Sequence, residues 1–256
     1  MSFQPLNFAS VAKFNSATSS EFLSFYQDYV LKKLREDSLK PKNKTFAPSS
    51  FRCARKCWFR LRGVETDMLT NPDPVLNFKA EVGTARHEII QSNLKDALGD
   101  DWIEVPDYLS RHPIPYEYTL THKNLETLIE ISDPPIRFAC DGIIRWKDKI
   151  YLLEIKTADY DSWNSLTDWK AVHKDQIQCY STLLGLPHVI VIYEDRQYGD
   201  LKVYEEFVNQ LESQAVLDRM HYIQEMVECN LAPDRVPNGD YMCNNCEYRV
   251  KCKQWG

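Results

Sequence analysis

The chain has 256 residues, of which 43% are hydrophobic, 27% charged and 12% aromatic, which excludes a disordered or fibrous protein. Lysine and arginine total 31 against 37 aspartate and glutamate residues, so the formal net charge is −6. This acidic balance by itself argues against a general nucleic-acid binder, which normally carries a basic surface.

Helices are predicted from apolar residues at helical spacing over 20–36, 82–98, 172–184 and 209–229. Extended segments are predicted over 114–121, 136–146, 149–157, 188–194 and 201–207. The residues Lys147-Asp148-Lys149 separate two of these segments and indicate a hairpin at the centre of a sheet. We assign residues 1–45 to an N-terminal helical extension and 46–256 to the main domain, with a cysteine-bearing tail over 237–256. Such a mixture of strands and helices predicts an irregular α/β fold.

The N-terminal sequence lacks a basic segment followed by an apolar one, and no apolar run approaches the roughly 18 residues of a transmembrane helix. We therefore expect an intracellular protein without a membrane partner. In a reducing compartment, the eight cysteines are more readily explained as metal or redox ligands than as disulfides.

The segment 138–157 carries charged residues within otherwise apolar strands. Asp141 falls in the first arm of the predicted hairpin. Glu154 and Lys156 share one face of the second arm, and Ile155 points into the opposite layer. Charged side chains among apolar neighbours are costly unless they pair or bind a metal, and Mg²⁺ or Mn²⁺ would remove the repulsion between two carboxylates. An exposed hairpin with a Glu–Lys pair accounts equally well for this spacing.

Two predicted helices carry polar residues that such a site could use. His87 lies on the inward face of the helix 82–98, in step with three apolar residues further along it. Taken alone, it is most simply a core histidine with a satisfied hydrogen bond. Gln176 and Tyr180 are four residues apart and share one face of the helix 172–184.

Together these residues resemble the motifs of the PD-(D/E)XK nuclease superfamily, specifically its RecB-like branch. That branch has E-x-G-x3-H on a helix, D-G on a strand, E-x-K on the next strand and Q-x3-Y on a later helix. The chain has all four in order: Glu81, Gly83 and His87, then Asp141-Gly142, then Glu154-Ile155-Lys156, then Gln176 and Tyr180. The resemblance covers residues 49–252. It implies a restriction-endonuclease-like core in which a central mixed sheet is flanked by helices.

The resemblance also implies a role for each of these residues. Metal binding is expected of three side chains and one carbonyl, those of His87, Asp141, Glu154 and Ile155. Catalytic roles are expected of Lys156, Glu154 and Asp141. Contact with nucleic acid or with the attacking water is expected of Gln176 and Tyr180, and a supporting role of Glu81 and Gly83. The proline that often precedes the family's aspartate is replaced here by Cys140, as is common in this branch.

The C-terminal tail contains Cys243, Cys246 and Cys252, which form a partial metal site that lacks a fourth ligand. Cys53 and Cys57 are the candidates for that ligand. One upstream cysteine with three in the tail resembles the iron–sulfur subset of RecB-like nucleases, including the CRISPR-associated RecB-like exonucleases and the AddB nuclease domain. The family pattern around the upstream cysteine favours Cys53 as a ligand of a structural [4Fe–4S] cluster. Cys57 is the rival ligand, and a zinc site is the alternative.

The remaining thiols, Cys140, Cys179 and Cys229, lie within apolar patterns, and we expect all three to be buried. The segment 51–63 differs from the rest of the chain because it has no acidic residue and interleaves cations with aromatic side chains. This pattern suits single-stranded nucleic acid, and we expect DNA contacts from Arg52, Arg55, Lys56 and Arg60. A helix with a solvated cationic face and a buried aromatic face has the same pattern.

We therefore expect a divalent-metal-dependent deoxyribonuclease, an exonuclease that hydrolyses phosphodiester bonds at single-stranded DNA ends by in-line attack of water. The resemblance implies work in DNA recombination, repair or replication, with helicases, annealing proteins or CRISPR proteins as possible partners. One alternative is a nuclease or DNA-binding subunit of a multiprotein complex for recombination or CRISPR adaptation. The other is a zinc-stapled interaction module without catalysis, which leaves Asp141, Glu154 and Lys156 unexplained.

Overall fold

The computed structural model describes residues 17–38, 40, 43–67, 74–123, 125–236, 241–243 and 246–255. Its helices are α2 (Ala17–Ser38), α3 (Ala54–Leu61), α4 (Pro74–Leu98), α5 (Val105–Arg111), α6 (Tyr160–Asn164), α7 (Ala171–Leu184), α8 (Gln210–Glu228) and α9 (Arg249–Gln254). Its strands are β1 (Trp102–Ile103), β2 (Tyr118–Lys123), β3 (Glu126–Ile131), β4 (Ile136–Phe138), β5 (Gly142–Trp146), β6 (Lys149–Ala158), β7 (His188–Asp195) and β8 (Leu201–Phe207). Over these residues, every helix is too short or too polar to cross a lipid bilayer.

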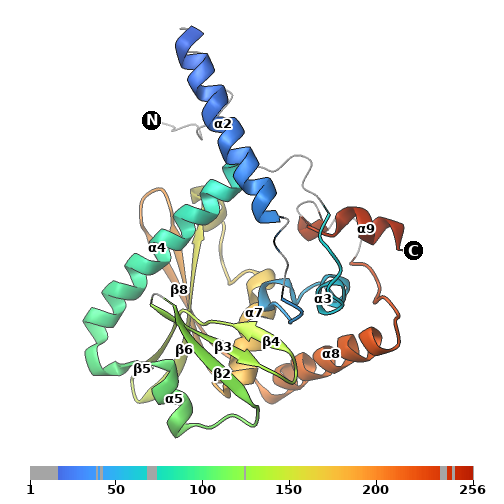
Figure 1. The fold of residues 1–256 in the computed structure, drawn as a ribbon. Helices are drawn as coiled ribbons and strands as arrows, with labels where there is room; N and C mark the ends of the chain where they lie inside the picture. The colour runs from blue at the N-terminus through green and yellow to red at the C-terminus, as the bar shows by residue number, and fades with distance from the viewer. Residues whose placement is uncertain are drawn as a thin grey trace.

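The main sheet has the strand order β1-β5-β6-β7-β8, with helices packed against it (Figure 1). The expected fold, a central mixed sheet flanked by helices, is confirmed. The expected β5–β6 hairpin is also confirmed, and its turn residues Lys147 and Asp148 have positive φ angles of 48° and 66°. The central strand is β6, which pairs with β5 in this hairpin on one side and with β7 in parallel on the other. Parallel neighbours need a crossover connection, and α7 lies in the connection between them.

A second sheet of three strands, β2-β3-β4, was not expected from the sequence. It divides the predicted strand 136–146, because Phe138 pairs with Ile129 in this sheet and Gly142 pairs with Leu153 in the main one. The chain passes between the two sheets at residues 139–141. Asp141 therefore precedes β5 instead of lying within an arm of the hairpin, which corrects the prediction.

The two faces of the main sheet pack against different helices. On one face, Tyr151, Leu153 and Ile155 of β6 form a cluster that is covered by apolar residues of α4. On the other face, Leu152 joins the larger core, to which α3, α7 and α8 contribute. Ile155 therefore lies in the opposite layer from Glu154, as the alternation along the strand predicted.

The predicted helices are present with shifted ends. The second helix starts at residue 74 rather than 82, and α7 ends at Gly185, where φ is 64° and the left-handed conformation favours glycine. In Figure 1, α2 projects away from the sheet, and its aromatic residue Phe25 is 68% exposed.

The unassigned cysteines divide into two groups. Cys140 and Cys179 are buried as expected. Cys229 is exposed, because it follows the last turn of α8 on the surface, so its expected burial is wrong.

Candidate active site and cysteine cavity

The candidate site lies where β6 continues past the beginning of β5. Gly142 and Leu153 are the terminal pair of these strands, so Glu154, Ile155 and Lys156 extend beyond the ladder. Asp141 fills the position beside them, because the Ile155 backbone N–H donates to Asp141 Oδ2 at 2.5 Å. The N–H and C=O groups of one strand residue face the same neighbour, so the Ile155 carbonyl also faces the Asp141 side.

Helix α4 contributes His87 and Gln91, which are one turn apart. His87 Nδ1 lies 3.7 Å from Asp141 Oδ1. Burial lowers the pKa of His87, but the Asp141 carboxylate outweighs this effect and the pKa ends above its ordinary value. Gln91 is buried and donates from Nε2 to the Asp141 carbonyl at 2.8 Å. Gln91 was missed in the sequence, although its spacing of four residues from His87 places it on the same helical face.

Glu154 is the most deeply buried charged group of the site, at 1% exposure. Its Oε1 accepts hydrogen bonds from Lys156 Nζ and, at 3.1 Å, from Gln176 Nε2. Its Oε2 is buried and makes no hydrogen bond to any described residue. Burial raises the pKa of Glu154 to about 7, against the opposing effect of the Lys156 charge.

Lys156 keeps its positive charge despite its burial. Burial alone lowers the pKa of this lysine, but the carboxylates of Glu154 and Asp141 together raise it above the ordinary value. The site therefore holds one charged lysine against two carboxylates, which are the groups expected to bind a cation.

Helix α7 supports the site from the other face of the sheet. Gln176 Nε2 donates to the Tyr180 hydroxyl at 2.8 Å as well as to Glu154. Tyr180 is 5% exposed, and its ring stacks on Phe138 with centroids 5.2 Å apart. The hydroxyl of this buried residue accepts a hydrogen bond from Gln176, and the expected contact of Tyr180 with nucleic acid stays a prediction.

The two supporting residues of the first motif differ in their surroundings. Gly83 allows close approach of α4 to β6, because a Cβ atom there would lie 3.2 Å from Thr157 Oγ1. Glu81 is exposed and accepts a hydrogen bond from Asn77 Nδ2 at 3.0 Å within the same helix. Glu81 thus takes no part in the contacts described for Asp141 and Glu154.

The donor atoms around Asp141 and Glu154 are of the right type for a divalent cation but are not arranged around one. In the described part of the chain, no group of three or more His, Cys, Asp or Glu side chains is arranged so that it could hold a metal ion. The carboxylates are instead directed at protein donors, Asp141 at the Ile155 N–H and Glu154 at Lys156. The donor types nevertheless suit Mg²⁺ or Mn²⁺, and the unpartnered Glu154 Oε2 is a buried acceptor that an ion would satisfy.

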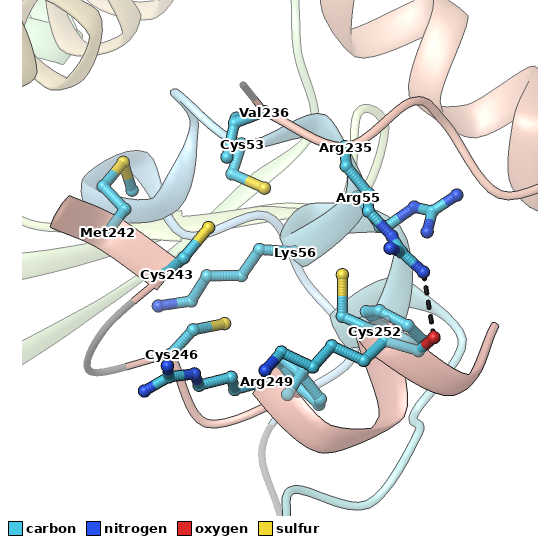
Figure 2. A pocket seen from close by; sticks show the side chains of 13 residues that line it. Cys53, Arg55, Lys56, Arg235, Val236, Met242, Cys243, Cys246, Arg249 and Cys252 are labelled. Atoms are coloured by element: carbon cyan, nitrogen blue, oxygen red, sulfur yellow. Dashed lines mark hydrogen bonds between the residues drawn. The ribbon is translucent and has the colours of Figure 1, made fainter. Parts of the chain in front are cut away.

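A second cluster lies at a cavity of about 240 Å³ between α3 and the C-terminal segment (Figure 2). Figure 2 shows four sulfur atoms turned toward the same space, those of Cys53, Cys243, Cys246 and Cys252. Lys56 and Arg249 line the same cavity. Burial raises the pKa of Cys246 to about 11, so this thiol is protonated at neutral pH unless a metal binds it. Four thiols are the donor type of a thiolate-bound metal group, although within the described residues no three of them are arranged to hold an ion in this conformation.

Cys57 lies outside this cavity. Its side chain is fully buried, and its Sγ lies 3.5 Å from the Ser50 carbonyl oxygen, to which the thiol donates. Burial raises the pKa of Cys57 to about 12. Of the two rival ligands, Cys53 is the one that faces the tail cysteines.

Four of the five cations of residues 51–63, those expected to contact DNA, have partners within the protein. Arg52 lies 3.8 Å from Asp175, Arg55 donates to the Pro233 carbonyl at 2.6 Å, Lys56 pairs with Glu247 at 2.9 Å, and Arg60 donates to the Thr45 carbonyl at 3.0 Å. Arg55 is also only 6% exposed. These bonds attach α3 to neighbouring segments, and the DNA contacts expected of these cations stay a prediction.

Among known proteins, solved structures of low sequence identity are similar to this chain, and they assign it to no family. No family model matches the chain, and no curated protein matches it. The crystal structure of SSO0001 is similar at 18% identity with a TM-score of 0.48, over 90% of this chain and 98% of that one. An alkaline exonuclease from Laribacter hongkongensis is similar at 15% identity with a TM-score of 0.39, over 76% of this chain and 93% of that one. The complex of that exonuclease with dAMP is similar at 14% identity with a TM-score of 0.35, over 78% of this chain and 93% of that one. At these values, the similarities carry no argument about activity.

Proposed function

We propose that this protein is a divalent-metal-dependent deoxyribonuclease of the PD-(D/E)XK type that acts as an exonuclease on single-stranded DNA ends. The observation that carries the proposal is the buried Glu154 carboxylate, which lies near Asp141, His87 and the charged Lys156. One of its oxygens has no hydrogen-bond partner among the residues that the structure describes. A buried acceptor without a partner is costly in a purely structural role. A cation-binding role removes that cost.

The chain's own residues suit phosphodiester hydrolysis. Held by His87, Asp141, Glu154 and the Ile155 carbonyl, a divalent ion would supply Lewis-acid activation and charge stabilisation. Lys156 brings a fixed positive charge for the negative charge that develops on the phosphate during attack by water. Gln176 holds the Glu154 carboxylate in place. The proposed preference for single-stranded ends rests on the motif resemblance.

For the cavity lined by four cysteines, we propose a [4Fe–4S] cluster bound by Cys53, Cys243, Cys246 and Cys252. Its role is structural, since it would join α3 to the C-terminal segment, which is distant in sequence. Zinc is the alternative occupant. Anaerobic purification followed by metal analysis tests this: about four irons per chain support the cluster, and stoichiometric zinc without iron contradicts it.

The nuclease is tested with single- and double-stranded oligonucleotides labelled at either end, with and without Mn²⁺. We expect the wild type to degrade DNA only with the metal, and Glu154→Gln and Lys156→Met to lose at least about 100-fold in rate. Glu104→Gln is the matched control, because Glu104 pairs with Lys95 on the surface. Full activity in both site variants contradicts the proposal, as does a folded wild type that cleaves no substrate.

A further inference from the structure

A histidine outside the four motifs, His173, lies on α7 one turn before Gln176. Its Nδ1 is 2.6 Å from the hydroxyl oxygen of Tyr193 on β7, and the two rings are stacked with centroids 5.5 Å apart. The metal ligands and the Gln176–Tyr180 pair do not account for this contact. Its spacing of three residues from Gln176 is the only sequence signal that could have indicated it.

The hydrogen bonds of Tyr193 favour the tautomer of His173 that carries its proton on Nε2. The backbone N–H of Lys170 donates to the Tyr193 hydroxyl at 3.0 Å, so this oxygen is already an acceptor. Within the described residues, the hydroxyl proton has no acceptor other than His173 Nδ1. A neutral imidazole that accepts at Nδ1 carries its proton on Nε2. Burial, together with the nearby charges of Lys156 and Lys170, lowers the pKa of His173 to about 3, which keeps the ring neutral.

Two neighbours of His173, its hydrogen-bond partner Tyr193 and the helix residue Gln176, border the candidate site. Tyr193 is the register partner of Lys156 on the neighbouring parallel strand. Gln176, one helical turn from His173, donates to Glu154. In the part of the chain that the structure describes, His173 Nε2 makes no hydrogen bond, and the residue is half-buried. It is therefore an oriented N–H donor without a protein acceptor, at the edge of a site that already holds a charged lysine.

We propose that His173 contacts the substrate, with its Nε2–H as a neutral hydrogen-bond donor to a phosphate oxygen of the nucleic acid beside Lys156. Tyr193 is then a positioning residue that sets the ring's tautomer. This inference rests on the proposed nuclease function and adds a substrate contact to the same site. A neutral donor suits the position, because an imidazolium there would be repelled by the Lys156 ammonium.

Two conservative variants separate this role from packing. In His173→Asn, the side-chain amide replaces Nδ1 and can still bond Tyr193, but no atom replaces Nε2. In His173→Gln, the longer side chain carries its N–H group close to the position of Nε2. If His173 only packs against Tyr193, Asn is the better replacement. If Nε2–H contacts the phosphate, Gln is the better one.

The test uses the full chain and a fluorescent single-stranded oligonucleotide, with anisotropy in Ca²⁺ for binding and single-turnover degradation in Mn²⁺ for rate. We expect His173→Asn to raise the Kd and KM about tenfold with a smaller change in kcat, and His173→Gln to stay within about threefold of the wild type. Thermal melting verifies that each variant is folded. If either fails to fold, Tyr193→Phe replaces it, and an increase in KM of about threefold or more is then expected.

Three outcomes overturn the inference. One is a folded His173→Asn that binds and cleaves like the wild type. Another is an equal defect in the Asn and Gln variants, or a Tyr193→Phe substitution without effect where that variant is needed. The third is a wild type without Mn²⁺-dependent cleavage, which overturns the proposed function as well and is thus distinguishable from the other two.

Discussion

Gly142 precedes the rest of β5 and follows Asp141, and the indole ring of Trp102 lies against it. A Cβ atom at residue 142 would lie 2.7 Å from Cη2 of Trp102, 3.1 Å from Cζ3 and 3.2 Å from Cζ2. Trp102 is 9% exposed and belongs to the cluster beneath α4, so its ring has little room to move away. Overpacking of this kind costs about 1–3 kcal/mol, and we expect Gly142→Ala to lower the free energy of unfolding by about 2 kcal/mol. It is also expected to displace the neighbouring Asp141 carboxylate and so weaken Mn²⁺ binding.

The three atoms that would be contacted all belong to the six-membered ring of the indole. Trp102→Leu removes them, so the destabilisations of Gly142→Ala and Trp102→Leu should not add, and we expect a coupling energy of about 1–2 kcal/mol in a double-mutant cycle. Urea unfolding in metal-free buffer measures the free energy of unfolding of the wild type, the two single variants and the double variant. Gly83→Ala is the graded control, because its Cβ would meet only Thr157 Oγ1 at 3.2 Å. Additive effects, or a Gly142→Ala variant as stable as the wild type, would refute the reasoning.

Further predictions concern protonation, the cysteines and α7. Burial raises the pKa of Glu154 to about 7, and the pKa of His87 is also raised, so both ligands must lose a proton before they bind Mn²⁺. We therefore expect the Mn²⁺ affinity measured by calorimetry to fall at least about tenfold per pH unit below 7, and equal affinity at pH 6 and pH 8 would contradict this. The raised pKa of Glu154 means that the folded state binds this proton more tightly than the unfolded chain. In metal-free protein the stabilisation that this carboxyl contributes is therefore complete below pH 4.5 and lost as the pH rises to about 7, which melting at several pH values measures. Cys53→Ala is expected to lose bound iron and to melt earlier, whereas Cys57→Ala keeps its iron; the reverse result would exchange their roles. Asp175 precedes Gln176 and lies 3.8 Å from Arg52 and 3.9 Å from Arg219. Asp175→Asn is expected to lower the free energy of unfolding in urea by at most about 1 kcal/mol and also to lower kcat. An unchanged kcat would exclude coupling between Asp175 and the site.

Several features of this protein could be predicted from the sequence, because they depend on residues close together in the chain. The alternation along residues 149–157 predicted a strand with Ile155 facing away from Glu154, and the structure has that arrangement. The end of α7 at Gly185 follows from the freedom of glycine to adopt a positive φ. The four short motifs, each weak alone, predicted His87, Glu154 and Gln176, which the fold brings near Asp141.

Other features depended on contacts between distant parts of the chain. Asp141 precedes β5 because the chain changes sheets there, and a continuous apolar pattern does not record such a change. The choice between Cys53 and Cys57 depends on tertiary packing: Cys53 precedes α3 in an extended conformation and lines the cavity, whereas Cys57 lies within the helix and packs into the core. The cations of residues 51–63 acquired internal partners for the same reason. Gln91 and His173 took their places through hydrogen bonds to the Asp141 carbonyl and to Tyr193. Periodicity records which residues share a face, whereas the partner that each face meets is decided only when the helices and sheets pack together.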